Sequence, residues 1–491
     1  MDRQAALAAA DTTLDPPDWS ALRDLGHRMV DDMVAHLAGV ADGPVWQPMP
    51  DALRDELRAP LPRAGEGLDA AYRDFQRLVQ PYATGNLHPA FAGWVHGGGN
   101  AAGMLAELLA GALNANLGGR DHAPVEVERQ VVRWAAEMVG LPASASGLLV
   151  TGTSIANFIA VLVARTAVLG SEARREGIGS ARLAAYASAA AHGCIPRALD
   201  MAGVGSAQLR LVPHDDAYRM RLDALAELIA ADRRAGVTPL LVVGTAGTVD
   251  TGAVDDLDGI AGLCAREGVR FHVDGAFGAL AMLSATRRAV LRGIERADSV
   301  AFDFHKWGQV PYDAGCILVR DGADQLAAFG QNVAYLRREV RGLAGGHPWP
   351  CDLGPDLSRG FRALKVWMTL KAYGADRIGA VVDRCCELAQ RLAGHVAAEP
   401  ALELLAPVPL NIVCFRVRGG ADDLDRLNAD IVADLQESGV AAPSTTSIGG
   451  KLAIRAALVN HRTTEREADR LVPAVLAAAQ ARQEGARQVR V

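Results

Sequence analysis

Between about residues 86 and 345 the sequence alternates short apolar runs with alanine-rich segments of helical pattern, and this alternation constrains the fold more than any other feature. The runs with the length and character of buried strands are Leu148–Val150, Leu183–Ala187, Leu240–Val243 and Val269–Val273. Strands that are apolar on both faces and separated by helices are typical of a parallel sheet covered on both sides. We therefore predict a doubly wound α/β core with a mostly parallel sheet.

The segment before this region has a helical pattern. Residues 19–40 place apolar side chains at spacings of three and four, which predicts an amphipathic helix. A proline-rich break at Ala59–Pro62 precedes a second helical segment near Asp69–Val79. We predict that residues 1–85 form a helical N-terminal segment whose apolar stripe packs on a partner subunit.

The C-terminal part has a mixed pattern. A long helical segment from Leu364 leads into strand-like runs at Leu410–Val417 and Leu452–Leu458. This order is typical of a smaller α+β domain. We therefore predict a large α/β domain over residues 86–363 and a small α+β domain over residues 364–491.

Charge and cysteine usage exclude several classes of function. The formal net charge is −7, from 50 Lys+Arg and 57 Asp+Glu, so the chain has no basic excess for nucleic acid or anionic membranes. The seven cysteines are scattered without a C-x-x-C pair, which suggests neither a disulfide framework nor a zinc site. A small-molecule substrate and a reduced, cytoplasmic environment are the expectation, and no metal site is predicted.

The sequence lacks export and membrane signals. The first residues contain an acidic side chain and soon reach Asp15–Asp18, so they do not have the basic and apolar regions of a signal peptide. Charges interrupt apolar stretches such as Gly259–Ala265 well before the ~20 residues that a membrane span requires. We expect a soluble protein.

Lys306 follows the strand-like segment that ends at Asp274, and this pairing points to chemistry. A buried lysine amine can form a Schiff base with an aldehyde, and a carboxylate at a strand end can hold a pyridinium nitrogen protonated. Taken singly, Lys306 is better explained as an ordinary surface lysine, and Asp274 as an N-cap or turn residue after a strand. Together they predict pyridoxal phosphate (PLP), because ligands of open α/β sheets bind at the carboxyl ends of strands.

Other turns offer groups that suit an anion or a ring, although each also has a structural explanation. Leu148–Asn157 reads as a strand, a glycine turn with Thr153 and Ser154, and a helix, which fits either phosphate binding or simple capping. His192 follows a strand and is either a satisfied structural residue or an imidazole stacked on a cofactor. The glycine-rich stretch around Thr248 permits close approach to a ligand, but loop geometry explains it equally well.

The order of these motifs resembles that of the PLP-dependent group II decarboxylases, the family of aromatic-L-amino-acid decarboxylase. The resemblance covers most of the chain, and its motifs are Asn86–Pro89, Thr153-Ser154, His192, Gly247-Thr248, His272–Asp274, His305–Trp307, Leu357–Trp367 and Val459–Thr463. It implies the PLP-dependent transferase-like fold (fold type I), a homodimer with active sites at the subunit boundary, and decarboxylation of an amino acid.

The resemblance also implies roles for individual residues. Lys306 would be the Schiff-base lysine, Asp274 the partner of the pyridine nitrogen, and His192 the imidazole stacked over the ring. The phosphate end would be held by Thr153, Ser154 and Ser299, with Asp303 and His305 as further candidates, while Thr248 would lie near His192.

Tyr335 falls where the family has a mobile-loop tyrosine that protonates the carbanion after loss of CO₂. Relatives that form aldehydes oxidatively tend to alter this tyrosine or the stacked histidine, so Tyr335 and His192 favour an amine product. Regulatory relatives add a basic helix-turn-helix domain, which residues 1–85 do not resemble.

The substrate pocket departs from the family pattern. Trp94, Val95 and His96 would shape it, and Gly97 stands where the aromatic enzymes have a threonine that touches the substrate; Gly193 likewise replaces a serine near the phosphate. Trp94 favours an aromatic substrate, although a tryptophan is also common in core packing. We predict decarboxylation of an L-amino acid, with an aromatic side chain favoured; the alternatives are an acidic or other non-aromatic substrate, or an aldehyde synthase or aminotransferase.

Overall fold

The computed structural model describes residues 13–330, 339–419, 421 and 423–489. For residues 486–489 it describes the backbone alone. The described residues form two compact units, which meet in the sequence between Gly85 and Asn86. The division into three parts at residues 85 and 363 stays a prediction.

The first unit is helical. Its elements are α2 (Trp19–Ala38), α3 (Asp51–Glu56), α4 (Leu68–Asp74), the π-helical turn η1 (Phe75–Val79) and the short η2 (Gln80–Tyr82). Helix α2 begins where the Asp18 carboxylate accepts the backbone N–H of Ser20 and of Ala21. The Tyr72 hydroxyl of α4 donates to Asp32 of α2 at 2.7 Å, which ties the two helices together. The helix predicted over residues 19–40 is confirmed and ends at Ala38.

The larger sheet of the second unit has seven strands in the order β2-β8-β7-β6-β5-β3-β4. The strands are β2 (Ser146–Val150), β3 (Leu183–Ser188), β4 (Leu209–Val212), β5 (Thr238–Thr245), β6 (Arg270–Asp274), β7 (Ser299–Asp303) and β8 (Gly315–Val319). Only β8 runs antiparallel to its neighbours within this sheet. The four apolar runs predicted as strands lie in β2, β3, β5 and β6, which confirms the mostly parallel sheet.

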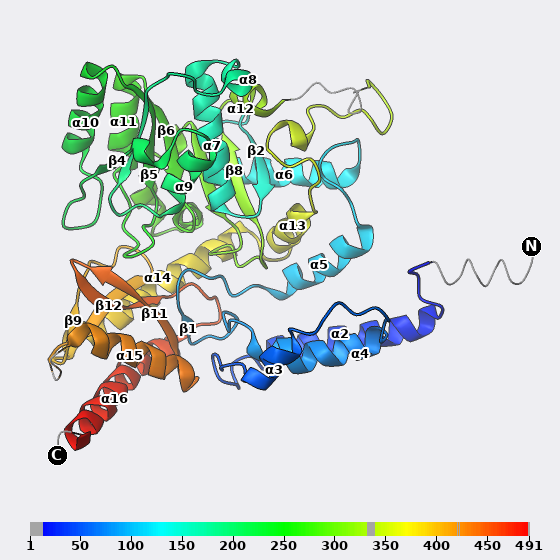
Figure 1. Cartoon of the computed structure of the whole chain (residues 1–491), viewed down its shortest axis with the longest axis vertical. Helices are drawn as coiled ribbons and strands as arrows, with labels where there is room; N and C mark the ends of the chain where they lie inside the picture. The colour runs from blue at the N-terminus through cyan, green and yellow to red at the C-terminus, as the bar shows by residue number, and fades with distance from the viewer. Residues whose placement is uncertain (1–12, 331–338, 420, 422, 490–491) are drawn as a thin grey trace, which may run out of the picture. The chain divides into compact units, whose positions relative to one another are not determined.

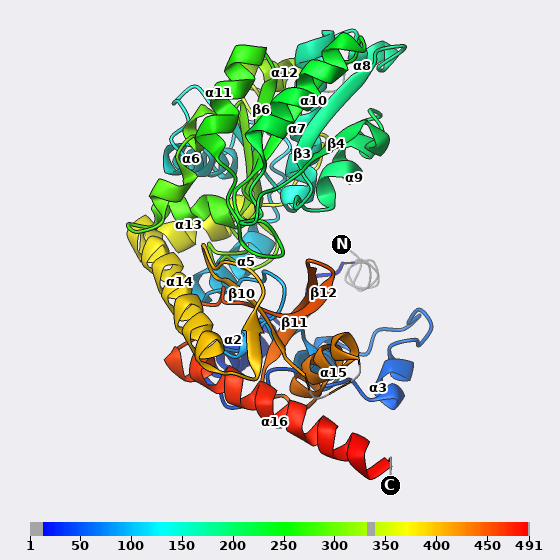
Figure 2. The same ribbon diagram turned by 90° about the vertical axis from the view of Figure 1, so that its left-hand side faces the viewer.

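Helices cover both faces of this sheet because its strands are apolar on both sides. On one face α7 (Thr153–Leu169) and α9 (Cys194–Met201) pack against alternate strand residues such as Ala185 and Leu241. On the other face α6 (Ala123–Met138), α10 (Leu222–Arg234) and α11 (Leu257–Glu267) pack against the intervening ones, such as Tyr186 and Val242. The layered arrangement is visible in Figures 1 and 2.

A second sheet has five strands in the order β1-β11-β12-β10-β9. They are β1 (Phe91–Ala92), β9 (Leu402–Leu404), β10 (Ile412–Val417), β11 (Ala442–Ile448) and β12 (Lys451–Ala457). The runs predicted near 410–417 and 452–458 correspond to β10 and β12. The short β1 comes from the beginning of the second unit, about 350 residues before its neighbour β11. The two strands are parallel, and Phe91 of β1 pairs with Ala442 of β11.

Further helices complete the second unit. They are α5 (Ala101–Leu113), α8 (Ala173–Glu176), α12 (Gly322–Phe329), α13 (Arg362–Tyr373), α14 (Ala375–Ala398), α15 (Leu424–Glu437) and α16 (Glu465–Val489). The short helical turns are η3 (Ser206–Gln208), η4 (Gly278–Leu283), η5 (Arg288–Leu291), η6 (Ile294–Arg296) and η8 (Pro350–Asp352). None of the helices that the structure describes combines the length and apolar character needed to cross a lipid bilayer.

Candidate active site

The carboxyl ends of three neighbouring parallel strands meet at one cavity. Thr245, Asp274 and Asp303 are the last residues of β5, β6 and β7, and all three line a cavity of about 390 Å³. The residues around it are Trp94, Val95, His96, Thr151, Gly152, Thr153, Ser154, His192, Cys194, Thr245, Gly247, Val249, Asp274, Ala276, Phe277, Asp303, His305, Lys306 and Tyr312. This is where ligands of open α/β sheets bind.

Lys306 is held at the cavity by the end of β7. Its Nζ lies 2.9 Å from Oδ2 of Asp303, and its side chain retains 23% exposure. The Asp303 carboxylate is almost fully buried, and its Oδ1 accepts the backbone N–H of Thr153 at 2.8 Å. The strand therefore positions both the amine and the first turn of α7.

The first turn of α7 approaches the cavity through a glycine turn. A Cβ on Gly315 would lie 2.5 Å from the Cα of Gly152, so β8 and this turn approach each other closely only without side chains. Thr153 and Ser154 follow at the helix start, where the helix dipole favours an anion, although Asp303 already accepts the backbone N–H of Thr153. The buried Thr153 hydroxyl has no hydrogen-bond partner among the described residues.

Asp274 lies deeper, at the end of β6. Its Oδ1 accepts the N–H of Ala276 and its Oδ2 accepts the Asn157 amide, both at 3.1 Å. Burial raises the pKa of this carboxyl, while Lys306, Asn157 and Ala276 act in the opposite direction. A carboxylate in this position can hold a proton on a basic nitrogen in the cavity.

Of the three histidines that line the cavity, His192 is exposed and His305 is buried. The Nδ1 of His192 accepts the N–H of Cys194 at 3.1 Å, and the imidazole is exposed. His305 is buried, which lowers its pKa to about 4, so its imidazole is neutral at pH 7. Because His305 Nδ1 accepts the N–H of Ala314, its proton is on Nε2, which can donate into the cavity.

Aromatic rings form one wall. The rings of Trp94 and His96 are stacked with centroids 5.7 Å apart, and Tyr312 meets His96 edge-on at 5.9 Å. Val95, between the first two, is buried. Gly97 packs against backbone, because a Cβ there would lie 2.3 Å from the carbonyl oxygen of His305. A threonine-like side chain at this position has no room in this chain.

Not every predicted site residue reaches the cavity. Ser299 lies at the opposite end of β7, where its hydroxyl is 2.8 Å from Nδ1 of His272, a placement that gives no support to a phosphate contact. Thr248 is buried in the loop after β5, where its hydroxyl lies 3.0 Å from that of Thr251. Tyr335 lies outside the described residues.

The structure adds cavity residues that the sequence did not single out. Thr245, Cys194, Phe277 and Tyr312 line the cavity, and the buried Thr245 hydroxyl has no hydrogen-bond partner in the described part of the chain. Position at a strand end could have identified Thr245, which lies within the glycine-rich stretch around Thr248. Tyr312 carried no signal, since it follows the lysine motif in an irregular segment.

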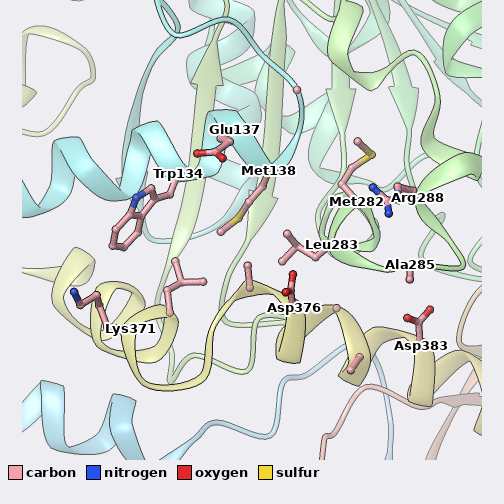
Figure 3. Close-up of a pocket in the computed structure, with 15 residues that line it drawn as sticks. Trp134, Glu137, Met138, Met282, Leu283, Ala285, Arg288, Lys371, Asp376 and Asp383 are labelled. Carbon is pink, nitrogen blue, oxygen red and sulfur yellow. The ribbon is translucent and has the colours of Figure 1, made fainter.

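A larger cavity, of about 750 Å³, lies between α6 and α14 and contains none of the predicted site residues (Figure 3). Two of its polar side chains are already engaged, because Lys371 lies over the Trp367 ring and Asp383 accepts the hydroxyls of Ser284 and Thr286. Chemistry, and not volume, therefore identifies the smaller cavity as the candidate site.

The smaller cavity fits PLP. An amine at Lys306 can bind an aldehyde, and a buried carboxylate at Asp274 can pair with a ring nitrogen. The unpartnered hydroxyls of Thr153 and Thr245 and the beginning of α7 offer donors for an anionic group. An amine, a carboxylate and donors to an anion are the groups that are needed to bind the aldehyde, the ring nitrogen and the phosphate of PLP.

Comparisons with known proteins agree with this assignment. The family described as "Pyridoxal-dependent decarboxylase conserved domain" matches residues 50–418. The chain is 33% identical to aromatic-L-amino-acid decarboxylase of Bacillus atrophaeus over 91% of this chain and 93% of that protein. It is 31% identical to histidine decarboxylase of Drosophila melanogaster over 91% of this chain and 54% of the fly protein.

Solved structures give the same result. The structure of Oryza sativa TDC with PLP and tryptamine matches with a TM-score of 0.87 and 26% identity, over 96% of this chain and 100% of that one. This likeness confirms the predicted PLP-dependent transferase-like architecture of fold type I.

Proposed function

Because this chain belongs to the pyridoxal-dependent decarboxylase family, we propose that it decarboxylates an aromatic L-amino acid and releases the corresponding amine. The chain is a PLP-dependent carboxy-lyase and its cofactor is pyridoxal 5′-phosphate. The identity of the substrate, the amine product and the roles of individual residues are the proposal.

The aromatic wall is the observation that carries the substrate class. Trp94, His96 and Tyr312 offer ring faces and edges with which a planar side chain can stack. Among the described residues that line the cavity, Lys306 is the only lysine or arginine. An acidic side chain would find no second cation among the described residues that line the cavity, which favours an aromatic over an acidic substrate.

The reaction divides between cofactor and protein. PLP, when bound, supplies an electron-withdrawing ring that accepts the electron pair left by departing CO₂. Lys306 supplies the amine that anchors the aldehyde and is released by the substrate amine. Asp274 holds the ring nitrogen protonated, so that the ring withdraws electrons most strongly.

The remaining residues orient the cofactor. Thr153, Ser154 and the Nε2–H of neutral His305 would donate to the phosphate, while Asp303 would position Thr153 and Lys306 through its two carboxylate oxygens. His192 would pack over the ring from the exposed side of the cavity. Ser299 and Thr248 have no contact role in this proposal.

The substrate proposal is tested by a matched panel. Purified enzyme with PLP is assayed for CO₂ and amine with tryptophan, tyrosine, phenylalanine, histidine, leucine and glutamate, each in the L form. We expect the aromatic amino acids to have kcat/KM at least tenfold above leucine and glutamate. A Tyr312→Leu variant should narrow that ratio, whereas Leu404→Ala, at an exposed position on β9, should leave it unchanged. Preferred turnover of glutamate or leucine would overturn the aromatic assignment.

The amine product is tested at Tyr335, which we propose as the proton donor to the α-carbon after CO₂ leaves. Tyr335→Phe removes only the hydroxyl, so amine formation should fall while PLP content stays unchanged. Aldehyde, ammonia and peroxide should then appear, because the carbanion persists long enough to react with dioxygen. Wild-type amine formation by this variant, or aldehyde as the main wild-type product, would contradict the proposal.

A cytoplasmic location also remains a proposal. It is supported by the seven cysteines, which have no paired spacing.

A further inference from the structure

A line of buried polar groups lies behind Asp274, on the side away from the cavity entrance. It runs from Asn157 of α7 through His272 of β6 to Ser299 of β7. The Asn157 amide nitrogen donates to Asp274 at 3.1 Å, His272 Nε2 lies 2.8 Å from Asn157 Oδ1, and His272 Nδ1 lies 2.8 Å from Ser299 Oγ. The exposed fractions of Asn157, His272 and Ser299 are 1%, 1% and 5%.

With Asp274 ionised, only one set of proton positions satisfies these three contacts. The Asp274 carboxylate accepts, so the Asn157 amide must turn its NH₂ toward Asp274 and its oxygen toward His272. The Nε2 of His272 must then carry the proton, and Nδ1 must accept from the Ser299 hydroxyl. Every donor in the line therefore points toward Asp274, and reversal of any one would place two acceptors together.

The direction of the line matters because burial alone disfavours a charged Asp274. The titratable groups that act on this site from the surrounding elements are Lys306, His192, Cys194 and His272. Of these, His272 is kept neutral by burial, which lowers its pKa to about 3, so it contributes a dipole and no charge. Donation from Asn157 adds to that of the Ala276 N–H and favours the ionised carboxylate.

We propose that Asn157, His272 and Ser299 are positioning residues that hold the Asp274 carboxylate ionised and oriented toward the cofactor ring nitrogen. The inference rests on the proposed role of Asp274, which lines the cavity. It extends that role to three residues that do not line the cavity. Ser299, predicted from the sequence to bind phosphate, instead terminates this line. Weakening the line lowers the affinity for PLP, because the ring nitrogen then meets a carboxylate that is less ionised or turned away.

The first test compares two buried asparagines. Asn157→Leu keeps the volume of the side chain but removes its hydrogen bonds. The control is Asn428→Leu, which makes the same change at a fully buried asparagine of α15. The hydrogen bonds that Asn428 forms with described residues go to the backbone of Val417 and Leu424. Cofactor-free enzyme is titrated with PLP by fluorescence, and the Tm of the cofactor-free form is measured in parallel.

We expect Asn157→Leu to raise the Kd for PLP at least tenfold and Asn428→Leu to change it less than twofold, while both lower Tm. The absorption of bound PLP should also shift with pH at a different midpoint in Asn157→Leu. If both variants lower Tm but leave the Kd within twofold of wild type, the line is structural only and the inference is wrong.

Conservative variants supply a second test that does not depend on the asparagine variants folding. His272→Gln keeps a donor near the place of Nε2, whereas His272→Leu removes it, so only the leucine variant should weaken PLP binding. Ser299→Ala should raise the Kd a few-fold, and its control is Ser284→Ala, a buried serine that donates to Asp383 instead. Equal PLP affinity in His272→Gln and His272→Leu would overturn the inference.

Failure of the inference is distinguishable from failure of the proposed function. If wild-type enzyme binds no PLP, or if Asp274→Ala leaves PLP affinity unchanged, the role of Asp274 is wrong and the line has no function through it. If wild type binds PLP and Asp274→Ala weakens it, but Asn157→Leu behaves like Asn428→Leu, only the positioning line is refuted.

Discussion

The Nζ of Lys306 lies 2.9 Å from Oδ2 of Asp303, while the other oxygen of the same carboxylate accepts the backbone N–H of Thr153 at 2.8 Å. One buried carboxylate thus connects the amine with the first turn of α7. These two groups would bind opposite ends of the cofactor, the aldehyde and the phosphate, so their separation is set by Asp303.

Replacing Asp303 should separate its two functions. Asp303→Ala leaves the Thr153 N–H without its acceptor, which should lower the free energy of unfolding of the cofactor-free enzyme by about 1–3 kcal/mol. Asp303→Asn retains an acceptor oxygen and should lose less than half as much. Urea unfolding followed by circular dichroism measures both. Equal losses would mean that the charge of Asp303, and not its acceptor, stabilises the fold.

A buried ion pair secures β2, the strand that leads into this turn. Arg359 donates to both carboxylate oxygens of Glu128, at 2.9 and 2.5 Å, and to the carbonyl of Leu149. Arg359→Met would leave the buried Glu128 without its charged partner, with only the Leu149 N–H still donating to it, so the free energy of unfolding should fall by about 3–5 kcal/mol. The double variant with Glu128→Gln should recover part of the loss. An exposed pair gives the control, since Arg175→Met, opposite Glu172, should cost under about 1 kcal/mol.

Acid sensitivity should depend partly on His272. Its pKa is about 3 in the folded protein and near its ordinary value of 6.5 in the unfolded chain, so the folded state binds fewer protons between these values. Stability should therefore fall as the pH falls from 6.5 toward 3, by about 1.4 kcal/mol per pH unit from this group. His272→Gln should remove this share and leave that of His305, whose pKa is also lowered. Urea unfolding of the cofactor-free form at pH 7, 6 and 5 measures the slopes, and identical slopes in variant and wild type would contradict the assignment.

The sequence identified the large sheet because four of its strands are short apolar runs separated by helical segments. The same reasoning placed Asp274 at the carboxyl end of a strand and paired it with Lys306. Both residues line the cavity. The sequence could not place Ser299 correctly, because the segment from Ser299 to Asp303 forms the whole of β7. Its first and last residues therefore lie at opposite ends of the strand. With a rise of ~3.3 Å per residue, Ser299 begins β7 far from Asp303, which ends it.

Long-range pairing accounts for the other differences. The two-residue β1 is too short to show periodicity, so nothing in the sequence joined Phe91 to Ala442. Asn157 read as an ordinary position of α7, and its role emerges only when α7 crosses β6 and meets Asp274 and His272. Tyr312 enters the cavity from an irregular segment, which no local pattern predicts.

We propose that the enzyme is a homodimer, and α5 supplies the structural argument. Leu105, Leu108, Leu109 and Leu113 are 40%, 58%, 48% and 62% exposed and recur at helical spacing on one side of α5. Such a stripe is typical of a subunit interface. Leu108→Glu combined with Leu109→Glu should shift sedimentation from dimer to monomer at micromolar concentration. Val290→Glu, at an isolated exposed position, should not. A wild-type monomer with full activity would refute the proposal.

The central claim is that Lys306 carries PLP and that amino-acid decarboxylation takes place in the cavity around it. The most direct test reduces purified enzyme with borohydride, digests it, and locates the cofactor by mass spectrometry, with CO₂ release measured on unreduced samples of wild type and Lys306→Ala. We predict a phosphopyridoxyl group on Lys306 in the wild type, and loss of both the visible absorption and nearly all CO₂ release in the variant. Cofactor attached to another lysine, or undiminished CO₂ release from Lys306→Ala, would contradict the claim.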